Sequence, residues 1–290
     1  MTPNPLFSVL IANYNNGKYL MDAINSVYAQ TYTNWEIILV DDASTDNSKE
    51  LYKELEKDSR IHIFYNEENK GCGYTKRRCA ELANGEILGF LDPDDALSAD
   101  ALETMIIEHL RNDGLALVYS NYFLCDEKLN VIQASTHQCT LPQGLTFLEY
   151  GKGAISHFVS FKQKSYQKTF GISPDIKMAV DYDLYYRLEE VGETKYIPNV
   201  LYYYRTGTGK NISLGNNAIK ALFWSYVGMI DACRRRSIPI EEIVLPRFLA
   251  EISNYSKYES LYQSICNSKT YRLGLIITSP YRLIKRLLKK

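Results

Sequence analysis

The sequence has no run of apolar residues that approaches the roughly 18 needed to cross a bilayer, and we therefore expect no transmembrane helix. Its opening segment, MTPNPLFSVLIANYNN, lacks the basic region and the long apolar core of a secretory signal. None of the six cysteines forms a C-x-x-C pair, which argues against a zinc knuckle and a redox motif. Reduced thiols in a cytoplasmic protein are the simplest interpretation.

The chain also lacks an excess of charge of either sign, because 33 basic residues face 34 acidic ones. Nucleic-acid binding is therefore not expected, since it requires a basic surface. With 290 residues, 46% of them apolar, the chain is long enough for one large α/β domain with or without a small appendage. Tyrosine is plentiful at 24 copies; packing is its commoner use, but its flat face and polar tip also suit sugars and bases.

Strand and helix signals alternate along the first half of the chain. Short apolar runs predict strands at 7–12, 35–40, 61–65 and 87–91, and helical spacing of apolar residues predicts helices at 19–29, 44–55 and 75–83. This alternation predicts parallel βαβ units, in which ligands bind beyond the carboxyl ends of the strands. The predicted fold class is α/β, a mostly parallel, Rossmann-like sheet flanked by helices.

The second half of the chain is more mixed. We predict a strand at 117–123, a helix at 181–190, a strand at 199–204 and a helical pattern from Asn216 to Ser268. The glycine-containing segment from Thr206 to Gly215 is the best candidate for a boundary.

Three carboxylates follow the fourth predicted strand, in the sequence LDPDDAL: Asp92, Asp94 and Asp95. Like charges this close repel one another, and a divalent cation would relieve the repulsion. Mg²⁺ and Mn²⁺ prefer oxygen ligands and often bind one or two carboxylates together with substrate phosphates. The alternative is an acidic turn in which Asp94 or Asp95 caps a helix at 100–110.

Further candidates follow the first two predicted strands. Tyr14 can stack on a base, a contact worth roughly 1–3 kcal/mol in single-stranded nucleic-acid complexes. Asp42, in the sequence VDDASTD, can accept hydrogen bonds from a base or a ribose. The alternatives are a packing aromatic at Tyr14 and a helix start at Asp42.

Two charged clusters lie on predicted helices. The first cluster consists of Lys76, Arg77 and Arg78 and precedes the acidic loop, the segment at 92–95. Because adjacent helix positions point in different directions, we expect at most one of the three to face a diphosphate and the others to be in solvent. Asp181 and Asp183 begin a later helix, where a carboxylate can accept the proton of an acceptor hydroxyl. The alternative is that both only stabilise the helix N-terminus.

Taken together and in this order, these motifs resemble the family 2 glycosyltransferases, which have the GT-A fold and invert the anomeric centre. The matching stretches are FSVLIANYNNGKYLMDAINSVYAQTYTNWEIILVDDASTD (7–46), NKGCGYTKRRCAELANGEILGFLDPDDAL (69–97) and MAVDYDLYYRLEEVG (178–192), and IPNVLYYYRTG (197–207) is similar to the strand that closes such domains. The resemblance implies a GT-A domain at 1–210, with a nucleotide-sugar-binding half at 5–115 and an acceptor half at 116–210, and a helical C-terminal extension at 211–290.

The resemblance also implies roles for single residues. Those assigned to the nucleotide-sugar donor are Ala12, Tyr14, Asp42, Lys76 and Asp92, and those assigned to the metal, Mn²⁺ or Mg²⁺, are Asp94 and Asp95. Asp181 matches the catalytic base, and His157 falls in the region that contacts the acceptor. The chain departs from many relatives in having Val180 where a Glu precedes the base, and no His after Arg205 as a third metal ligand.

The last twenty residues contain six basic side chains and no acidic one, with Leu283, Ile284, Leu287 and Leu288 on one helical face. Such a helix can lie on an anionic membrane surface; a docked terminal helix is the alternative. With the resemblance, this predicts a glycan or lipid-linked acceptor and a role in cell-surface polysaccharide or glycolipid biosynthesis. The enzyme would be cytoplasmic, with peripheral contact to the inner membrane.

Two other functions are consistent with part of these motifs. A nucleotidyltransferase also uses a metal and carboxylates, but normally has a Gly-rich basic loop near the first strand, which NYNNGK at 13–18 does not resemble. A catalytically silent nucleotide-sugar-binding domain would not need the complete set of Asp clusters. The absence of a Q-x-x-R-W motif favours a single-addition enzyme over a processive synthase.

Overall fold

The computed structural model describes residues 4–151, 153–208 and 217–267, with residues 255–267 described by their backbone alone. The strands are β1 Phe7–Asn13, β2 Trp35–Asp41, β3 Ile61–Tyr65, β4 Ile87–Phe90, β5 Ala96–Leu97, β6 Leu115–Cys125, β7 Val131–Ala134, β8 Val159–Lys162 and β9 Glu193–Arg205. The helices are α1 Gly17–Tyr28, α2 Ser48–Leu55, α3 Cys72–Leu82, α4 Ala101–Arg111, α5 Phe147–Tyr150, α6 Gln163–Tyr166, α7 Val180–Glu189, α8 Ala218–Arg235 and α9 Ile240–Asn267.

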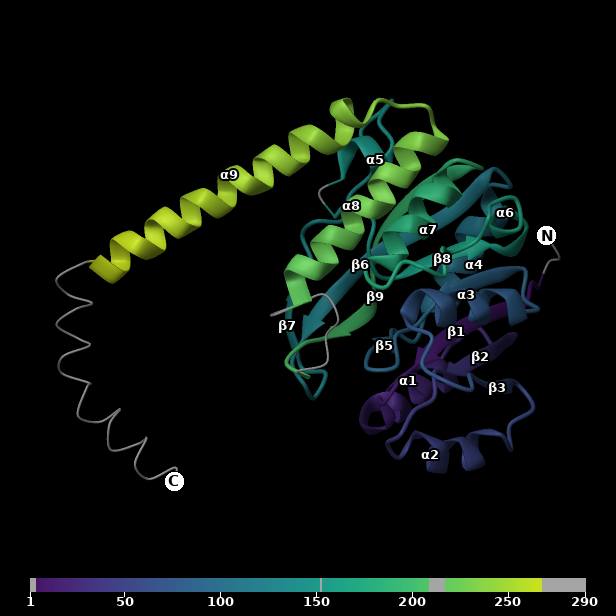
Figure 1. The fold of residues 1–290 in the computed structure, drawn as a ribbon. Coiled ribbons are helices and arrows are strands. Elements are labelled where there is room, and N and C mark those ends of the chain that lie inside the picture. The colour runs from purple at the N-terminus through teal and green to yellow at the C-terminus, as the bar shows by residue number, and fades with distance from the viewer. Residues whose placement is uncertain (1–3, 152, 209–216, 268–290) are drawn as a thin grey trace, which may run out of the picture. The chain divides into compact units, whose positions relative to one another are not determined.

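The strands of the described chain form one mixed sheet in the order β3-β2-β1-β4-β8-β6-β9-β5, with β7 paired to β6 (Figure 1). Strands β3, β2, β1 and β4 are parallel, which confirms the predicted βαβ units. Strand β8 is antiparallel to both of its neighbours, whereas β6 and β9 are parallel to each other. Helix α3 packs on β1 and β2, and α7 packs against α8 and β6.

The first half folds this way because its apolar runs are buried on both faces of the sheet. Every residue of β2 is buried, and β1 is buried except for Ala12, as expected for parallel strands covered by helices. On α1 the predicted apolar stripe is confirmed, since Leu20, Ala23, Ile24 and Val27 are all fully buried. These side chains belong to the core that holds the carboxyl ends of the strands in place.

Two predicted boundaries differ from the structure. Helix α2 begins at Ser48 rather than at Ser44, because the Asp46 carboxylate accepts hydrogen bonds from the backbone and the hydroxyl of Ser48, whereas the Ser44 hydroxyl bonds a neighbouring loop. The helical region from 216 to 268 is divided into α8 and α9. The break contains Ser237, with a positive φ of 54°, and Pro239, which lacks an amide donor.

The chain divides into two compact units, Met1–Arg236 and Ser237–Lys290, and α8 lies in the first of them. The predicted division into a glycosyltransferase domain at 1–210 and an extension at 211–290 stays a prediction. The predicted basic tail at 271–290 lies outside the described residues, as does most of the boundary loop predicted at 206–215. None of the described helices combines the length and the apolar character required to cross a bilayer.

His109 of α4 is a titratable group enclosed within the core. Its side chain is fully buried, and its Nε2 lies 3.0 Å from the Ser160 hydroxyl. Burial, reinforced by the charge of Lys162, lowers the pKa of His109 to about 3. The imidazole is therefore neutral in the folded protein between pH 5.5 and pH 7.5.

We expect the free energy of unfolding to decrease as the pH falls below the unfolded-state pKa of His109, roughly 6.5. In that window the unfolded chain binds a proton that the folded protein excludes, so stability is lost by up to about 1.4 kcal/mol per pH unit. Urea unfolding at pH 7.5 and 5.5 tests this: His109→Gln should lose less stability between the two pH values than the parent protein. The exposed His137→Gln is the control, and an identical loss in all three proteins would contradict the prediction.

Candidate active site

A cavity of about 880 Å³ opens where β1, β2 and β4 end. All the site residues predicted from the sequence line it: Ala12, Tyr14, Asp42, Lys76, Asp92, Asp94, Asp95, His157 and Asp181. The strand register explains part of this convergence. Asn13 at the end of β1 is paired with Asp41 at the end of β2, so the segments that follow emerge side by side.

Asp42 lies just beyond β2 and is 3% exposed. Its Oδ1 accepts hydrogen bonds from Asn66 Nδ2 at 2.7 Å and from the Lys70 amide at 2.8 Å, and its Oδ2 accepts one from the Gly71 amide at 2.9 Å. Gly71 has a φ of 88°, a conformation that favours glycine, and it immediately precedes α3. The carboxylate therefore orders the turn into α3, and its predicted contact with a base or ribose stays a prediction.

Asp95 is the most enclosed carboxylate of the acidic loop, at 1% exposure. Its Oδ2 accepts a hydrogen bond from the Tyr202 hydroxyl at 2.8 Å, and its Oδ1 accepts one from the Arg205 amide at 2.7 Å. Both donors belong to β9, so this strand fixes the loop from the opposite side. The alternative that Asp94 or Asp95 caps a helix is wrong, because β5 intervenes and Asp100 directly precedes α4.

The acidic loop fits a divalent cation as part of a ligand set rather than as a complete one. Within residues 4–151, 153–208 and 217–267, no three His, Cys, Asp or Glu side chains gather as a full metal site. The carboxylates are nevertheless crowded: burial, and then the charges of Asp94 and Asp92, raise the pKa of Asp95 well above its usual range. A cation held by one or two of them and by ligand phosphates would offset this repulsion.

Lys76 extends from α3 into the cavity and pairs with carboxylates from two other segments. Its Nζ lies 2.9 Å from Asp181 Oδ1 on α7 and 3.1 Å from Asp92 Oδ1 after β4. Burial by itself would lower the pKa of this ammonium group, but the charges of Asp181 and Asp92 raise it well above its usual range. Burial opposes ionisation of Asp92 as well, and Lys76 nevertheless holds the pKa of Asp92 below its usual range. The lysine is thus a permanent cation between the two carboxylates.

The prediction that at most one residue of the basic cluster faces the site is confirmed by Lys76. The other two keep part of their exposure to solvent, but each also binds the backbone of another segment. Arg77 Nη1 donates to the carbonyls of Phe170 and Ile172 at 3.0 and 3.1 Å, and Arg78 Nη1 donates to the Tyr65 carbonyl at 2.7 Å. Each guanidinium therefore joins α3 to a neighbouring segment.

His157 is held in an aromatic stack close to the Lys76 ion pairs, since it lines a pocket together with Lys76, Asp92 and Asp181. Its ring lies between Tyr202 and Tyr204, with centroids 4.9 and 5.2 Å away and interplanar angles of 14° and 13°, and Tyr122 meets its edge. Burial lowers the pKa of His157, which the charge of Asp92 only partly opposes. The imidazole is therefore a neutral member of an aromatic wall.

Several residues of the site were not predicted from the sequence. Tyr122, Tyr182, Tyr185 and Tyr204 also line the cavity. Arg205 is 2% exposed, and its guanidinium bonds the Asp94 carbonyl at 2.5 Å and the Asp22 carboxylate at 2.6 Å. The run of aromatics before Arg205 was a usable signal for the wall, whereas nothing in the local sequence indicates the partners of Arg205.

The sequence is similar to a known protein family and to several bacterial proteins. The model of the family described as glycosyl transferase family 2 matches residues 8–172. A chondroitin synthase of Escherichia coli is 32% identical over 216 residues, which cover 72% of this chain and 30% of that protein. A glycosyltransferase of Haemophilus influenzae is 31% identical over 77% of this chain and 86% of its own. The chain thus spans less than a third of the synthase and most of the second relative.

Solved structures are similar in fold. Structures of S. aureus TarS 1-349 in complex with UDP and with UDP-GlcNAc align with this chain at a TM-score of 0.56 in each case. Each alignment covers 77% of this chain and about two thirds of the other, 64% and 66%. Sequence identity is 16% and 17%, so the likeness concerns the fold alone.

Proposed function

The chain belongs to glycosyl transferase family 2, and from this premise we propose that it transfers a sugar from a nucleoside-diphosphate sugar to an acceptor hydroxyl with inversion of the anomeric centre. The family assignment makes it a glycosyltransferase, and the predicted GT-A fold is confirmed. The donor class, the stereochemistry and the role of each residue belong to the proposal.

The observation that carries the proposal is the Lys76 ion-pair cluster. It brings Asp92, from the loop assigned to the diphosphate, and Asp181, the candidate base, to the same ammonium group at 3.1 and 2.9 Å. A transfer reaction requires the leaving group and the attacking hydroxyl to meet at one carbon atom. A cavity of about 880 Å³ around these carboxylates has room for both substrates.

On the donor side, Tyr14 is 47% exposed and would offer its ring to a base, and Asp42, which lines the same cavity, would accept a further hydrogen bond from the nucleoside. Asp94 and Asp95 would hold Mn²⁺ or Mg²⁺, with Asp92 beside the diphosphate. When bound there, the cation would supply charge to offset that of the departing nucleoside diphosphate. The UDP and UDP-GlcNAc complexes of TarS support a uridine nucleotide as the first donor to test.

On the acceptor side, the Asp181 carboxylate accepts the proton of the attacking hydroxyl. The hydroxyl oxygen forms the new bond to the anomeric carbon while the bond to the diphosphate breaks, and the electron pair of that bond departs with the phosphate oxygen. Lys76 orients Asp181 through its 2.9 Å hydrogen bond. Tyr204, which is half-buried and lines the cavity, offers a flat ring on which an acceptor sugar can lie, while His157, stacked on Tyr202 and Tyr204, supports this ring from behind.

The similarity to a chondroitin synthase supports a saccharide acceptor and a role in cell-surface polysaccharide or glycolipid biosynthesis. The basic tail of the sequence favours a lipid-linked acceptor. The enzyme would then act on the cytoplasmic face of the membrane. Flotation of the full-length protein with anionic and with neutral vesicles tests that part by itself.

The first experiment is to incubate the protein with a panel of nucleotide-sugars, beginning with UDP-GlcNAc, in the presence of Mn²⁺, Mg²⁺ or EDTA. We expect one donor to release its nucleoside diphosphate by slow hydrolysis, and EDTA to reduce this release by at least about tenfold, since the cation offsets leaving-group charge. Release that is insensitive to EDTA would contradict the metal assignment. Pyrophosphate as the product would instead indicate a nucleotidyltransferase, and binding of a donor without any turnover would indicate a silent binding domain.

A further inference from the structure

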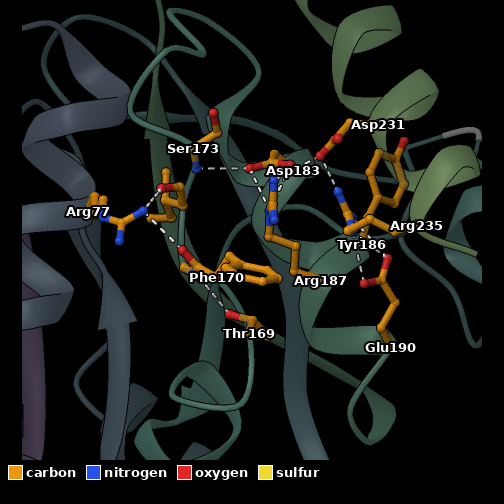
Figure 2. A network of polar contacts seen from close by, with 12 residues as sticks. Arg77, Thr169, Phe170, Ser173, Asp183, Tyr186, Arg187, Glu190, Asp231 and Arg235 are labelled. Atoms are coloured by element: carbon orange, nitrogen blue, oxygen red, sulfur yellow. Dashed lines mark hydrogen bonds and ion pairs between the residues drawn. The ribbon is translucent and has the colours of Figure 1, made fainter.

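A segment at 170–176 lies between α3 and α7, the helices that carry Lys76 and Asp181. On one side, Arg77 of α3 donates to the carbonyls of Phe170 and Ile172 at 3.0 and 3.1 Å. On the other side, the Asp183 carboxylate of α7 accepts a hydrogen bond from the Ser173 amide at 3.1 Å. Figure 2 shows Arg77 and Asp183 on opposite sides of this segment, each directed at its backbone.

The side chains that bind the segment lie within two positions of cavity residues on the same helices. Arg77 follows Lys76 on α3, and Asp183 is two positions after Asp181 on α7, so that on each helix one side chain faces the cavity and the other faces the segment. A change in the separation of the two helices at the segment is therefore expected to shift the backbone of Lys76 relative to that of Asp181.

The contact between α3 and the segment is close. A Cβ atom at Gly73, in the first turn of α3, would lie 2.2 Å from the Ile176 carbonyl oxygen and 2.8 Å from that of Ser173. Both are backbone atoms, which have little freedom to move aside. Ile172 and Ile176 are buried at 0% and 4% exposure, which anchors the segment in the core.

Asp183 is itself held in one orientation. It is fully buried, and both of its oxygens accept a hydrogen bond from Arg187 Nε at 3.0 Å. Arg187 Nη2 in turn lies 2.9 Å from the Asp231 carboxylate of α8, which also pairs with Arg235 (Figure 2). A buried carboxylate without partners is costly, so any side-chain conformation of Asp183 that breaks these hydrogen bonds is disfavoured.

The backbone conformation directly before α7 indicates that packing with the surrounding protein determines the position of this helix. Ala179, directly before the helix, has a φ of 54° and a ψ of 31°, the left-handed conformation. A non-glycine residue adopts it at a cost of about 1–2 kcal/mol, and it persists only where the surroundings determine it. Asp181, two residues later, is therefore placed by packing and by the Asp183 bonds rather than by a relaxed chain.

We propose that segment 170–176 is a spacer that sets the distance between Lys76 and Asp181, with Arg77 and Asp183 as its positioning residues. This inference rests on the proposed role of Asp181 as the base. Neither Arg77 nor Asp183 lines the cavity, so their effect on the reaction passes through Lys76 and Asp181.

The test uses Arg77→Ala in the full-length chain, because Arg77 is 34% exposed and its removal leaves the core intact. With the donor that gives the fastest nucleoside-diphosphate release, kcat should fall about tenfold and the donor KM should stay within about twofold, since the base is misplaced while donor contacts persist. Arg77→Lys, which keeps one donor group, should recover part of kcat. Arg111→Ala, which removes a comparable exposed ion pair on α4, is the matched control.

The double variant Arg77→Ala/Asp181→Asn separates positioning from a general structural effect. If Arg77 acts through Asp181, its removal should leave the residual rate of Asp181→Asn unchanged. A full tenfold further loss in the double variant, or a kcat for Arg77→Ala equal to that of the parent protein, would overturn the spacer proposal. An active Asp181→Asn would instead overturn the base assignment.

Amide hydrogen exchange supplies a readout that does not depend on turnover. Arg77→Ala should raise exchange rates in 170–176 and in the first turn of α7, with no change in β1 and β2. Gly73→Ala, in which a methyl group displaces the same backbone, should produce the same pattern. Unchanged exchange in 170–183 in both variants would overturn the proposal whatever the donor.

Discussion

Asp181→Asn is expected to lower the rate of sugar transfer by about 10²–10⁴-fold, the range that a general base contributes. Asparagine has the shape of aspartate, and its carbonyl oxygen can still accept the hydrogen bond from Lys76, which is 2.9 Å long in the parent protein. It has no basic oxygen to accept the proton of the acceptor hydroxyl. Affinity for the free nucleotide should be unaffected, because the proposed function assigns Asp181 to the acceptor and not to the nucleotide.

The measurement combines initial rates, with the donor identified in the nucleotide-sugar panel, and calorimetric binding of UDP. Asp113→Asn is the control, since Asp113 is exposed and pairs only weakly with Lys162 and Lys164 at 3.7 Å. A rate for Asp181→Asn close to that of the control would mean that another group accepts the proton. Loss of UDP binding would mean that Asp181 serves the donor instead.

Lys76→Met is expected to lower the free energy of unfolding by about 2–3 kcal/mol and to abolish measurable transfer. Methionine fills a similar volume but leaves the Asp92 and Asp181 carboxylates without their shared cation. Removing one partner of a fully buried ion pair costs about 3–5 kcal/mol. The estimate here is smaller because Asp92 and Asp181 retain 30% and 29% side-chain exposure, and water screens part of the loss.

Denaturant unfolding of Lys76→Met, with the exposed Lys49→Met as control, measures this effect without any substrate. Adding Asp181→Asn to Lys76→Met should restore part of the lost stability, because one of the two unpaired charges is then removed. Lys76→Arg should keep most of the stability. Parent-like stability of Lys76→Met would show that the cluster contributes little and that the carboxylates find other partners.

The location of the site could be predicted from the sequence because it depends on local patterns. Each apolar run that forms a buried parallel strand ends at a polar cluster, and the carboxyl ends of parallel strands lie at one edge of a sheet. Asp42 and Asp92 therefore had to lie at the same edge of the sheet once β1, β2 and β4 were parallel. Asp181 was assigned to the site by the resemblance of its motif to the family, and it lines the same cavity.

The partners of these residues could not be predicted in this way. Lys76 and Asp181 are separated by 105 positions, and Asp95 and the Tyr202 hydroxyl by 107. Propensity and periodicity describe a residue and its neighbours within a turn or a strand, whereas these contacts depend on how separate elements pack. The buried Glu36 of β2 is a similar case, since it accepts hydrogen bonds from Ser8 and Asn84 that no local pattern indicates.

The sequence by itself determined the βαβ order, the buried strands and the side chains placed at their ends, since burial and chain direction follow from short apolar runs and the turns between them. Only the tertiary structure decided which of the charged residues meet. It placed Lys76 in the cavity and Arg77 against the 170–176 segment, although the two are adjacent in the chain and both basic. The physical reason is that the partners a charged side chain meets depend on which elements pack against its face of the helix, and those elements are distant in sequence.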